Sequence, residues 1–193
     1  MKGKLGKHGE RHTLRFERTL RHSAEKVWLA LTEDGELSHW FPARVLGSRA
    51  KGEKLRFVFP DPESKVTGEM QDVQAEAQDE HLAAHGDAGM EGEVIVFDPP
   101  RVFEFTWHTE LMRFELEPVE GGTRLVFTHT FDEEPAAARN ATGWEVCFEA
   151  LERRLDGEAP LQHGVEHFDA LFAEYAEAFG PRASASKRPG AAE

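Results

Sequence analysis

The sequence predicts an α+β protein in which one curved antiparallel sheet wraps around a single long helix. Two observations lead to this fold class. Several segments between residues 92 and 131 alternate apolar and polar side chains and are joined by short turns, as in antiparallel hairpins. A long helix with a continuous apolar stripe follows them, and it is the element best suited to cover the apolar face of the sheet.

The first predicted strand runs from Thr13 to Leu20. Leu14, Phe16 and Leu20 share one face at a period of two, and Arg18 is the charged exception on that face. Residues 1–12 precede this strand and carry several lysines among glycines. We expect residues 1–12 to form a disordered, basic N-terminus.

Two short helices are expected directly after this strand. Ser23 is a suitable N-cap for the first helix, and Glu33-Asp34-Gly35 ends it. The second helix is expected from Gly35 to Trp40, because the proline at position 42 disfavours helical backbone before it. Two helices at this point are an unusual opening for a protein that is otherwise mainly strands.

The central part of the chain supplies about six further strands. A polar, acidic stretch over residues 61–90 interrupts them, and we expect it to be a long loop or insertion with at most a helical turn. The turns Asp98-Pro99-Pro100 and Glu120-Gly121-Gly122 separate later strands. The predicted strands are Ala43–Leu46, Lys54–Phe59, Gly92–Phe97, Val102–His108, Met112–Glu117 and Thr123–Phe131.

The C-terminal part of the chain is predicted to hold two helices and a tail. The long amphipathic helix covers Ala141–Leu155, and Gly157 is placed to end it. A second, appended helix is expected within residues 158–179, from His163 to Phe179. We expect residues 180–193 to be a disordered tail because they are rich in alanine, serine and charge.

Composition limits the partners and the compartment of the 193-residue chain. Its formal net charge is −13, and such acidity repels phosphate backbones, so no nucleic-acid partner is expected. There is one cysteine, no apolar run long enough to span a membrane, and no apolar segment typical of a signal peptide at the start. We therefore expect a cytoplasmic protein that does not bind membranes.

The facing aromatic side chains suggest a ligand cavity between the sheet and the long helix. A strongly curved sheet around one helix tends to leave a gap at one end, and such gaps hold ligands. The expected partner is a small hydrophobic or aromatic molecule, with no cofactor. The candidate walls of the cavity are Phe57, Phe105, Trp107, Phe114, Phe127, His129, Trp144 and Phe148.

Polar residues give weaker indications of chemistry. His129 shares a face with Phe127 and Phe131, so it is a candidate acid-base catalyst, although a core histidine with satisfied hydrogen bonds is more common. Cys147 lies on an apolar helix face and should be unreactive. Two histidine pairs at helical spacing, His81 with His85 and His163 with His167, lack a third ligand, so no metal site is expected.

Four segments in order resemble the Hsp90-ATPase-activator-like branch of the START/Bet v 1-like (SRPBCC) superfamily. They span about residues 13–157 and read FERTLRHSAEKVWLALTEDGELSHWFP, GEVIVFDPPRVFEFTW, LEPVEGGTRLVFTHTF and GWEVCFEALERRLDG. The resemblance implies the helix-grip fold, with a seven-stranded sheet around the C-terminal helix. The acidic segment 61–90 departs from the short connection that is usual in this branch.

The resemblance leaves three functions open. The first is the binding of a hydrophobic ligand, as in lipid and polyketide binders, and we favour it over catalysis. The second is an enzyme of the polyketide cyclase or hydrolase type with His129 as acid-base. The third is a chaperone-linked interaction protein similar to Hsp90 activators. A homodimer could also form through the sheet edge or the final helix.

Overall fold

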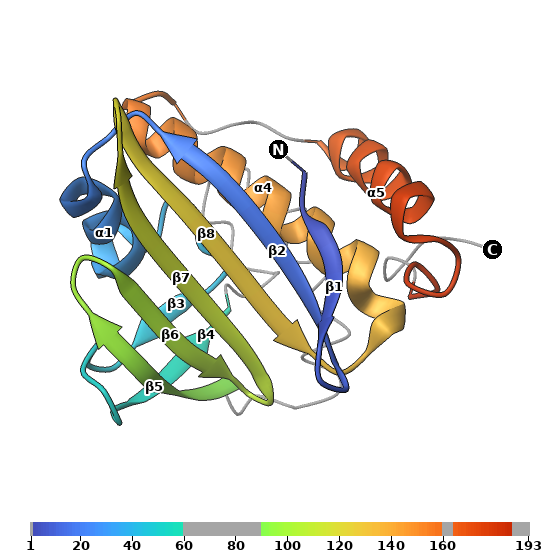
Figure 1. The fold of residues 1–193 in the computed structure, drawn as a ribbon, viewed down its shortest axis with the longest axis horizontal. Helices are drawn as coiled ribbons and strands as arrows, with labels where there is room; N and C mark the ends of the chain where they lie inside the picture. The colour runs from blue at the N-terminus through green and yellow to red at the C-terminus, as the bar shows by residue number, and fades with distance from the viewer. Residues whose placement is uncertain (1, 60–89, 160–163, 187–193) are drawn as a thin grey trace.

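The centre of the molecule is one sheet of eight antiparallel strands that curves around the long helix α4 (Ala137–Asp156), as Figure 1 shows. The structure is a computed structural model that describes residues 2–59, 90–159 and 164–186. The strands lie in the order β1-β2-β8-β7-β6-β5-β4-β3. Their bounds are β1 Lys4–His8, β2 Arg11–Leu20, β3 Arg44–Leu46, β4 Lys54–Val58, β5 Met90–Asp98, β6 Val102–Trp107, β7 Glu110–Val119 and β8 Gly122–Phe131.

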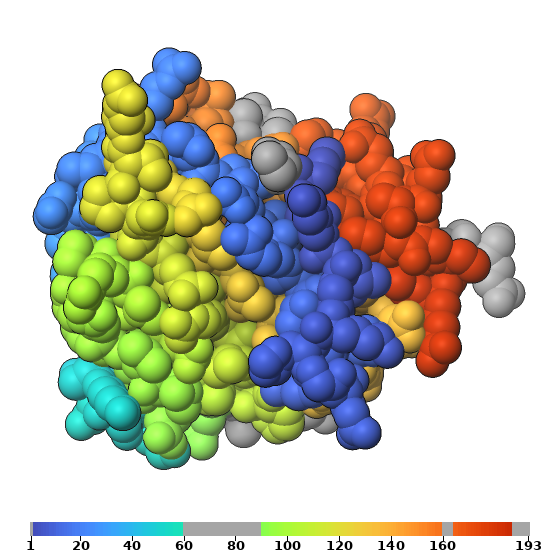
Figure 2. Space-filling model, viewed as in Figure 1, coloured from blue at the N-terminus to red at the C-terminus, as the bar shows by residue number. Residues whose placement is uncertain are grey.

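The N-terminal residues form a strand, so the predictions of a disordered segment over 1–12 and of a seven-stranded sheet are wrong. Strand β1 pairs with β2 through a turn at Gly9, whose φ of 61° favours glycine. Most of β1 is exposed, which is why it shows no alternating apolar pattern. The backbone N–H of Gly3 donates to the Tyr175 hydroxyl at 2.9 Å and fixes the start of the hairpin. In Figure 2 the hairpin forms a ridge beside the C-terminal helix.

Two helices follow β2, as predicted, but the second is shorter than expected. Helix α1 covers Ala24–Thr32, and the Ser23 hydroxyl accepts a hydrogen bond from the Lys26 N–H, which confirms the predicted N-cap. Helix α2 covers only Asp34–Leu37. The chain then turns, and the Trp40 indole N–H donates to the carbonyl of Ala30 at 2.8 Å. This bond fastens the residues after α2 to the end of α1.

The strands from β5 to β8 form a meander, and β2 closes against β8. In this register Leu14 faces His129 and Phe16 faces Phe127 across the β2–β8 pair. The predicted alternation is confirmed, with one buried face per strand. The outer face carries ion pairs, such as Arg113 with Glu104 at 2.7 Å, which are half-exposed and worth little stability individually.

Helix α4 covers the concave face of the sheet with its aromatic side chains. It begins at Ala137, four residues earlier than predicted, after the short 3₁₀ helix Glu134–Ala136. Gly157 adopts a left-handed conformation with φ 73° and ends the helix, as expected. The buried Arg18 of β2 donates to Glu145 of α4 at 2.5 Å, which explains the charged exception on the core face of that strand.

Helix α5 (Val165–Phe179) packs against α4 beside the β1 edge of the sheet, as Figure 1 shows. Phe168 and Leu171 meet Val146 of α4 in a small cluster of their own. The predicted disorder of the tail is wrong for residues 180–186, because Ala183 is buried and its carbonyl accepts from the Ala138 N–H at 2.9 Å. Among the described helices, none is long and apolar enough to cross a membrane.

Candidate ligand pocket

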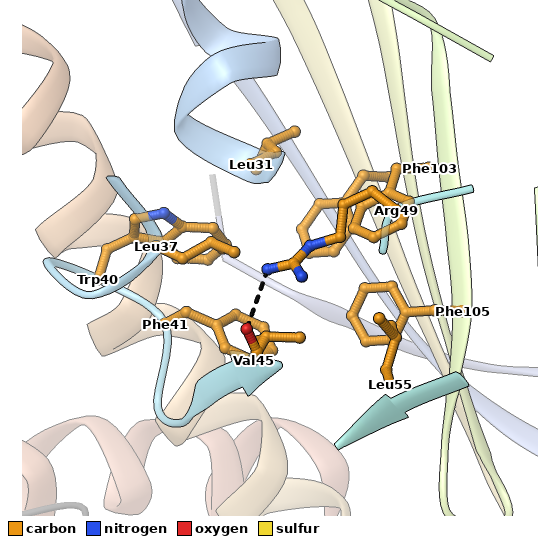
Figure 3. A pocket seen from close by; sticks show the side chains of 10 residues that line it. Leu31, Leu37, Trp40, Phe41, Val45, Arg49, Leu55, Phe103 and Phe105 are labelled. Carbon is orange, nitrogen blue, oxygen red and sulfur yellow. Dashed lines mark hydrogen bonds between the residues drawn. The ribbon is translucent and has the colours of Figure 1, made fainter. Parts of the chain in front are cut away.

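A small pocket opens on the concave side of the sheet, beside helix α1 rather than beneath α4. Its wall on the sheet side comes from β4, β6 and β7. The opposite wall comes from α1, α2 and the chain that leads from α2 through β3 toward β4, as Figure 3 shows. The lining residues are Leu31, Leu37, Trp40, Phe41, Val45, Arg49, Leu55, Phe103, Phe105 and Phe114.

The space inside is limited. The gap between the side chains measures about 250 Å³ when the part that opens toward solvent is counted. Most of this space lies too close to the side chains to be occupied, and what remains has room for about one water molecule. A larger molecule therefore enters only if one wall moves outward.

Arg49 is the charged residue of this apolar pocket, and its side chain is only 10% exposed. One Nη2 hydrogen bond goes to the Asp34 carboxylate at 2.5 Å and another to the Val45 carbonyl at 3.2 Å. Nη1 donates to the Gly47 carbonyl. Figure 3 shows the guanidinium between Leu31 and Val45. Its Nε is buried and has no hydrogen-bond partner among the residues that the structure describes.

Local backbone geometry explains why an arginine can lie in this position. Gly47 has a φ of 116°, and a Cβ on it would lie 2.3 Å from the Lys54 carbonyl oxygen. Only glycine allows the chain to approach the start of β4 so closely at this backbone angle. The turn at Gly47 therefore brings Arg49 back over the end of α1, with Asp34 at the N-terminus of α2 within reach.

The predicted wall residues separate into two groups. Phe105 and Phe114 line the pocket. The other six belong to the packed core between the sheet and α4, where the ring centroids of Phe127 and Trp144 are 4.5 Å apart and those of Phe57 and Trp107 are 5.0 Å apart. These six are Phe57, Trp107, Phe127, His129, Trp144 and Phe148.

His129 is buried, and both of its ring nitrogens have partners. The Trp144 indole N–H can only donate, and it lies 3.1 Å from Nδ1, so Nδ1 is the acceptor. Nε2 therefore carries the proton of the neutral ring and faces the Glu110 carboxylate at 2.7 Å. This arrangement holds the ring in one tautomer and leaves neither nitrogen facing the pocket, which favours a structural role over acid-base catalysis.

The remaining candidate groups do not converge on a reactive centre. Cys147 is buried on the apolar side of α4. His167 pairs with Glu149 at 2.9 Å, while His81, His85 and His163 lie outside the described residues, as does the acidic segment up to residue 89. In the part of the chain that the structure describes, no three potential ligands come together as a metal site.

The residues that the sequence did not reveal are those after α2. Trp40 and Phe41 are buried pocket residues in a turn without a repeating pattern, so periodicity could not place them. Arg49 looks like an ordinary loop arginine in the sequence. The available signal was the glycine two positions earlier, which marks a sharp turn but does not indicate where the turn leads.

Comparison with known proteins agrees with this architecture. The family model described as Activator of Hsp90 ATPase homolog 1-like protein matches residues 21–156. No curated protein is significantly similar to the chain.

Several solved structures share the fold at low sequence identity. A conserved protein of unknown function from Enterococcus faecalis is 19% identical with a TM-score of 0.67, over 92% of this chain and 90% of that one. CalU16 from Micromonospora echinospora is 16% identical with a TM-score of 0.64, over 92% and 94%. A Rhodobacter sphaeroides protein is 24% identical with a TM-score of 0.57, over 81% and 99%. At such low sequence identity, the structural similarity establishes the fold and does not indicate a ligand.

Proposed function

Because the chain belongs to the Activator of Hsp90 ATPase homolog 1-like family, we propose that it binds a small hydrophobic or aromatic molecule between its sheet and the α1–α2 segment. The observation that carries this proposal is the lining of the pocket. Of the ten described side chains that line it, nine are apolar and five of those nine are aromatic, with Arg49 as the charged exception. An apolar pocket with few polar groups is typical of small-molecule sites.

Entry of a ligand would require the wall formed by α2 and the residues that follow it to move. The sheet wall is held by continuous ladder hydrogen bonds between β6, β7 and β8. The opposite wall consists of the four-residue helix α2, the three-residue edge strand β3 and the turns around them. Short elements with few ladder bonds open at lower free-energy cost than a sheet interior, so we expect this wall to yield.

Toluene is a suitable first probe because it matches the apolar, aromatic lining. We expect a toluene titration, followed by NMR of the methyl groups, to shift saturably the signals of the pocket residues Leu31, Leu37 and Leu55. The substitution Leu37→Phe should fill the pocket and abolish these shifts.

The matched control is Leu29→Phe, which introduces the same side chain at an exposed position of α1 and should leave binding intact. Absence of saturable shifts in the unsubstituted protein would overturn the proposal. Equal binding by the Leu37→Phe variant would place the ligand elsewhere.

A second candidate function rests on the family description, which refers to activation of the Hsp90 ATPase. Such a role would require a direct contact with a chaperone. It would be supported if the purified protein stimulated ATP hydrolysis by an Hsp90-type chaperone in a saturable way. An unchanged rate at saturating protein would count against it.

A further inference from the structure

Among the residues that the structure describes, the Nε of Arg49 is buried without a hydrogen-bond partner, and Arg49 lines the pocket. Its N–H is a strong donor, and a buried donor without an acceptor costs free energy in the empty state. Three of the other N–H bonds of the guanidinium donate to protein oxygens, those of Asp34, Val45 and Gly47. A ligand that supplies an acceptor at Nε would remove this cost, so the pocket is suited to recognise a molecule that carries one.

The charge of the site is already balanced. Asp34 forms an ion pair with Arg49, so a carboxylate placed in the pocket would be a second anion beside one cation. The remaining lining side chains are apolar and offer nothing to stabilise it. Since burial of an uncompensated charge is costly, the acceptor that fits best is a neutral one.

A water molecule is a poor substitute for such a group. Buried waters usually make about three hydrogen bonds to protein groups. Within the described part of the chain Nε has no acceptor, and the rings of Phe103, Phe105 and Phe114 form much of the wall of the pocket. A water that reached Nε would leave most of its own hydrogen-bonding capacity unused.

We propose that the pocket selects neutral aromatic molecules that carry one hydrogen-bond acceptor, such as an aryl ketone, and that Arg49 Nε donates to that acceptor. This inference rests on the proposed function, because it names the class of ligand for the same pocket. Arg49 would then determine specificity, while the aromatic walls supply most of the affinity.

The test compares acetophenone with ethylbenzene, two molecules of similar shape of which only the first has a carbonyl. Dissociation constants are measured by methyl NMR in the unsubstituted protein and in Arg49→Met. A hydrogen bond to a charged group should make the preference for acetophenone about ten- to a hundredfold larger in the unsubstituted protein than in Arg49→Met. The matched control Arg44→Met, at an exposed position of β3, should retain the full preference.

Benzoate tests whether a second anion is disfavoured in the pocket, and this test leaves Arg49 in place. We expect benzoate to bind more weakly than acetophenone to the unsubstituted protein and to gain affinity in Asp34→Asn, where the cation is no longer neutralised. If both neutral probes bind but the preference does not depend on Arg49, or if benzoate binds most tightly, the inference is wrong and the proposed function stands. If neither neutral probe binds, the proposed function fails as well.

Discussion

At the scale of single residues, His129 shows how a polar side chain can be accommodated within an aromatic core. The ring lies between an indole that only donates and a carboxylate that only accepts, so its tautomer follows from its neighbours. Only Nε2 points toward the partly exposed Glu110, where the core meets solvent. The residue that seemed most reactive in the sequence therefore serves to connect β8, α4 and β7.

Replacement of His129 should destabilise the protein. His129→Ala would remove a buried ring and leave the Trp144 N–H without an acceptor, so we expect the free energy of unfolding to fall by about 2–4 kcal/mol. Urea denaturation would measure this loss. His8→Ala, at an exposed position of β1, serves as the control and should change stability by less than about 0.5 kcal/mol. A loss of comparable size in both variants would contradict the structural role of His129.

At the scale of elements, α5 is held to α4 by a buried polar contact as well as by apolar packing. The Tyr175 hydroxyl donates to Glu145, whose other carboxylate oxygen accepts from Arg18 of β2. The same hydroxyl accepts from the N–H of Gly3. One carboxylate on α4 thereby links the sheet, the N-terminal hairpin and the C-terminal helix.

Burial, and then the hydrogen bond to Glu145, raise the pKa of Tyr175 above its usual value near 10. Because the folded state holds the proton more tightly, this contribution to stability is complete below pH about 10 and is lost as the pH rises above it. We expect unfolding at alkaline pH to coincide with ionisation of the phenol. The chain has one tyrosine, so phenolate absorbance reports on this residue alone.

The comparison for this prediction is Tyr175→Phe. This variant should be less stable at neutral pH and should lose less stability than the unsubstituted protein between pH about 9 and 12. Lysines titrate in the same range in both proteins, so only the difference between the two is attributed to Tyr175. Identical pH profiles would show that the hydroxyl does not couple α5 to the core.

At the scale of the whole molecule, the topology separates local from distant pairing. Strands β5 to β8 pair with their neighbours in sequence through short turns, whereas β2 pairs with β8 from the other end of the chain. Local pairing costs less loop-closure entropy and tends to form first. We therefore expect the meander to be formed, and β2 to be still unpaired, in the transition state for folding.

The same substitution, phenylalanine to leucine, at one position in each part of the sheet tests this order of folding. Phe114 and Phe16 are both buried. Phe114→Leu in β7 should mainly slow folding, because the meander is formed in the transition state. Phe16→Leu in β2 should mainly accelerate unfolding, because β2 pairs only after the transition state. Stopped-flow chevron plots would separate the two rates. The opposite assignment of rates would mean that closure of β2 on β8 nucleates the fold.

Much of this architecture could be predicted from the sequence, because most strands bury one face and so display a period of two. The exposed strand β1 could not be found in this way, since its pairing with β2 leaves no apolar pattern. The position of the pocket was equally inaccessible. Aromatic residues predict a core, but which of them leave space depends on the turn at Gly47 and on the placement of Arg49, neither of which has a period.

Arg18 also has a consequence for how the strands align. A slip of β2 by two residues along β8 would keep every apolar side chain on the core face, so hydrophobic patterning alone does not forbid it. Such a slip would carry the guanidinium about 7 Å along the strand and would disrupt its ion pairs with Glu145 and Glu152, the first of which is buried. The buried ion pair therefore favours one register of β2 against β8.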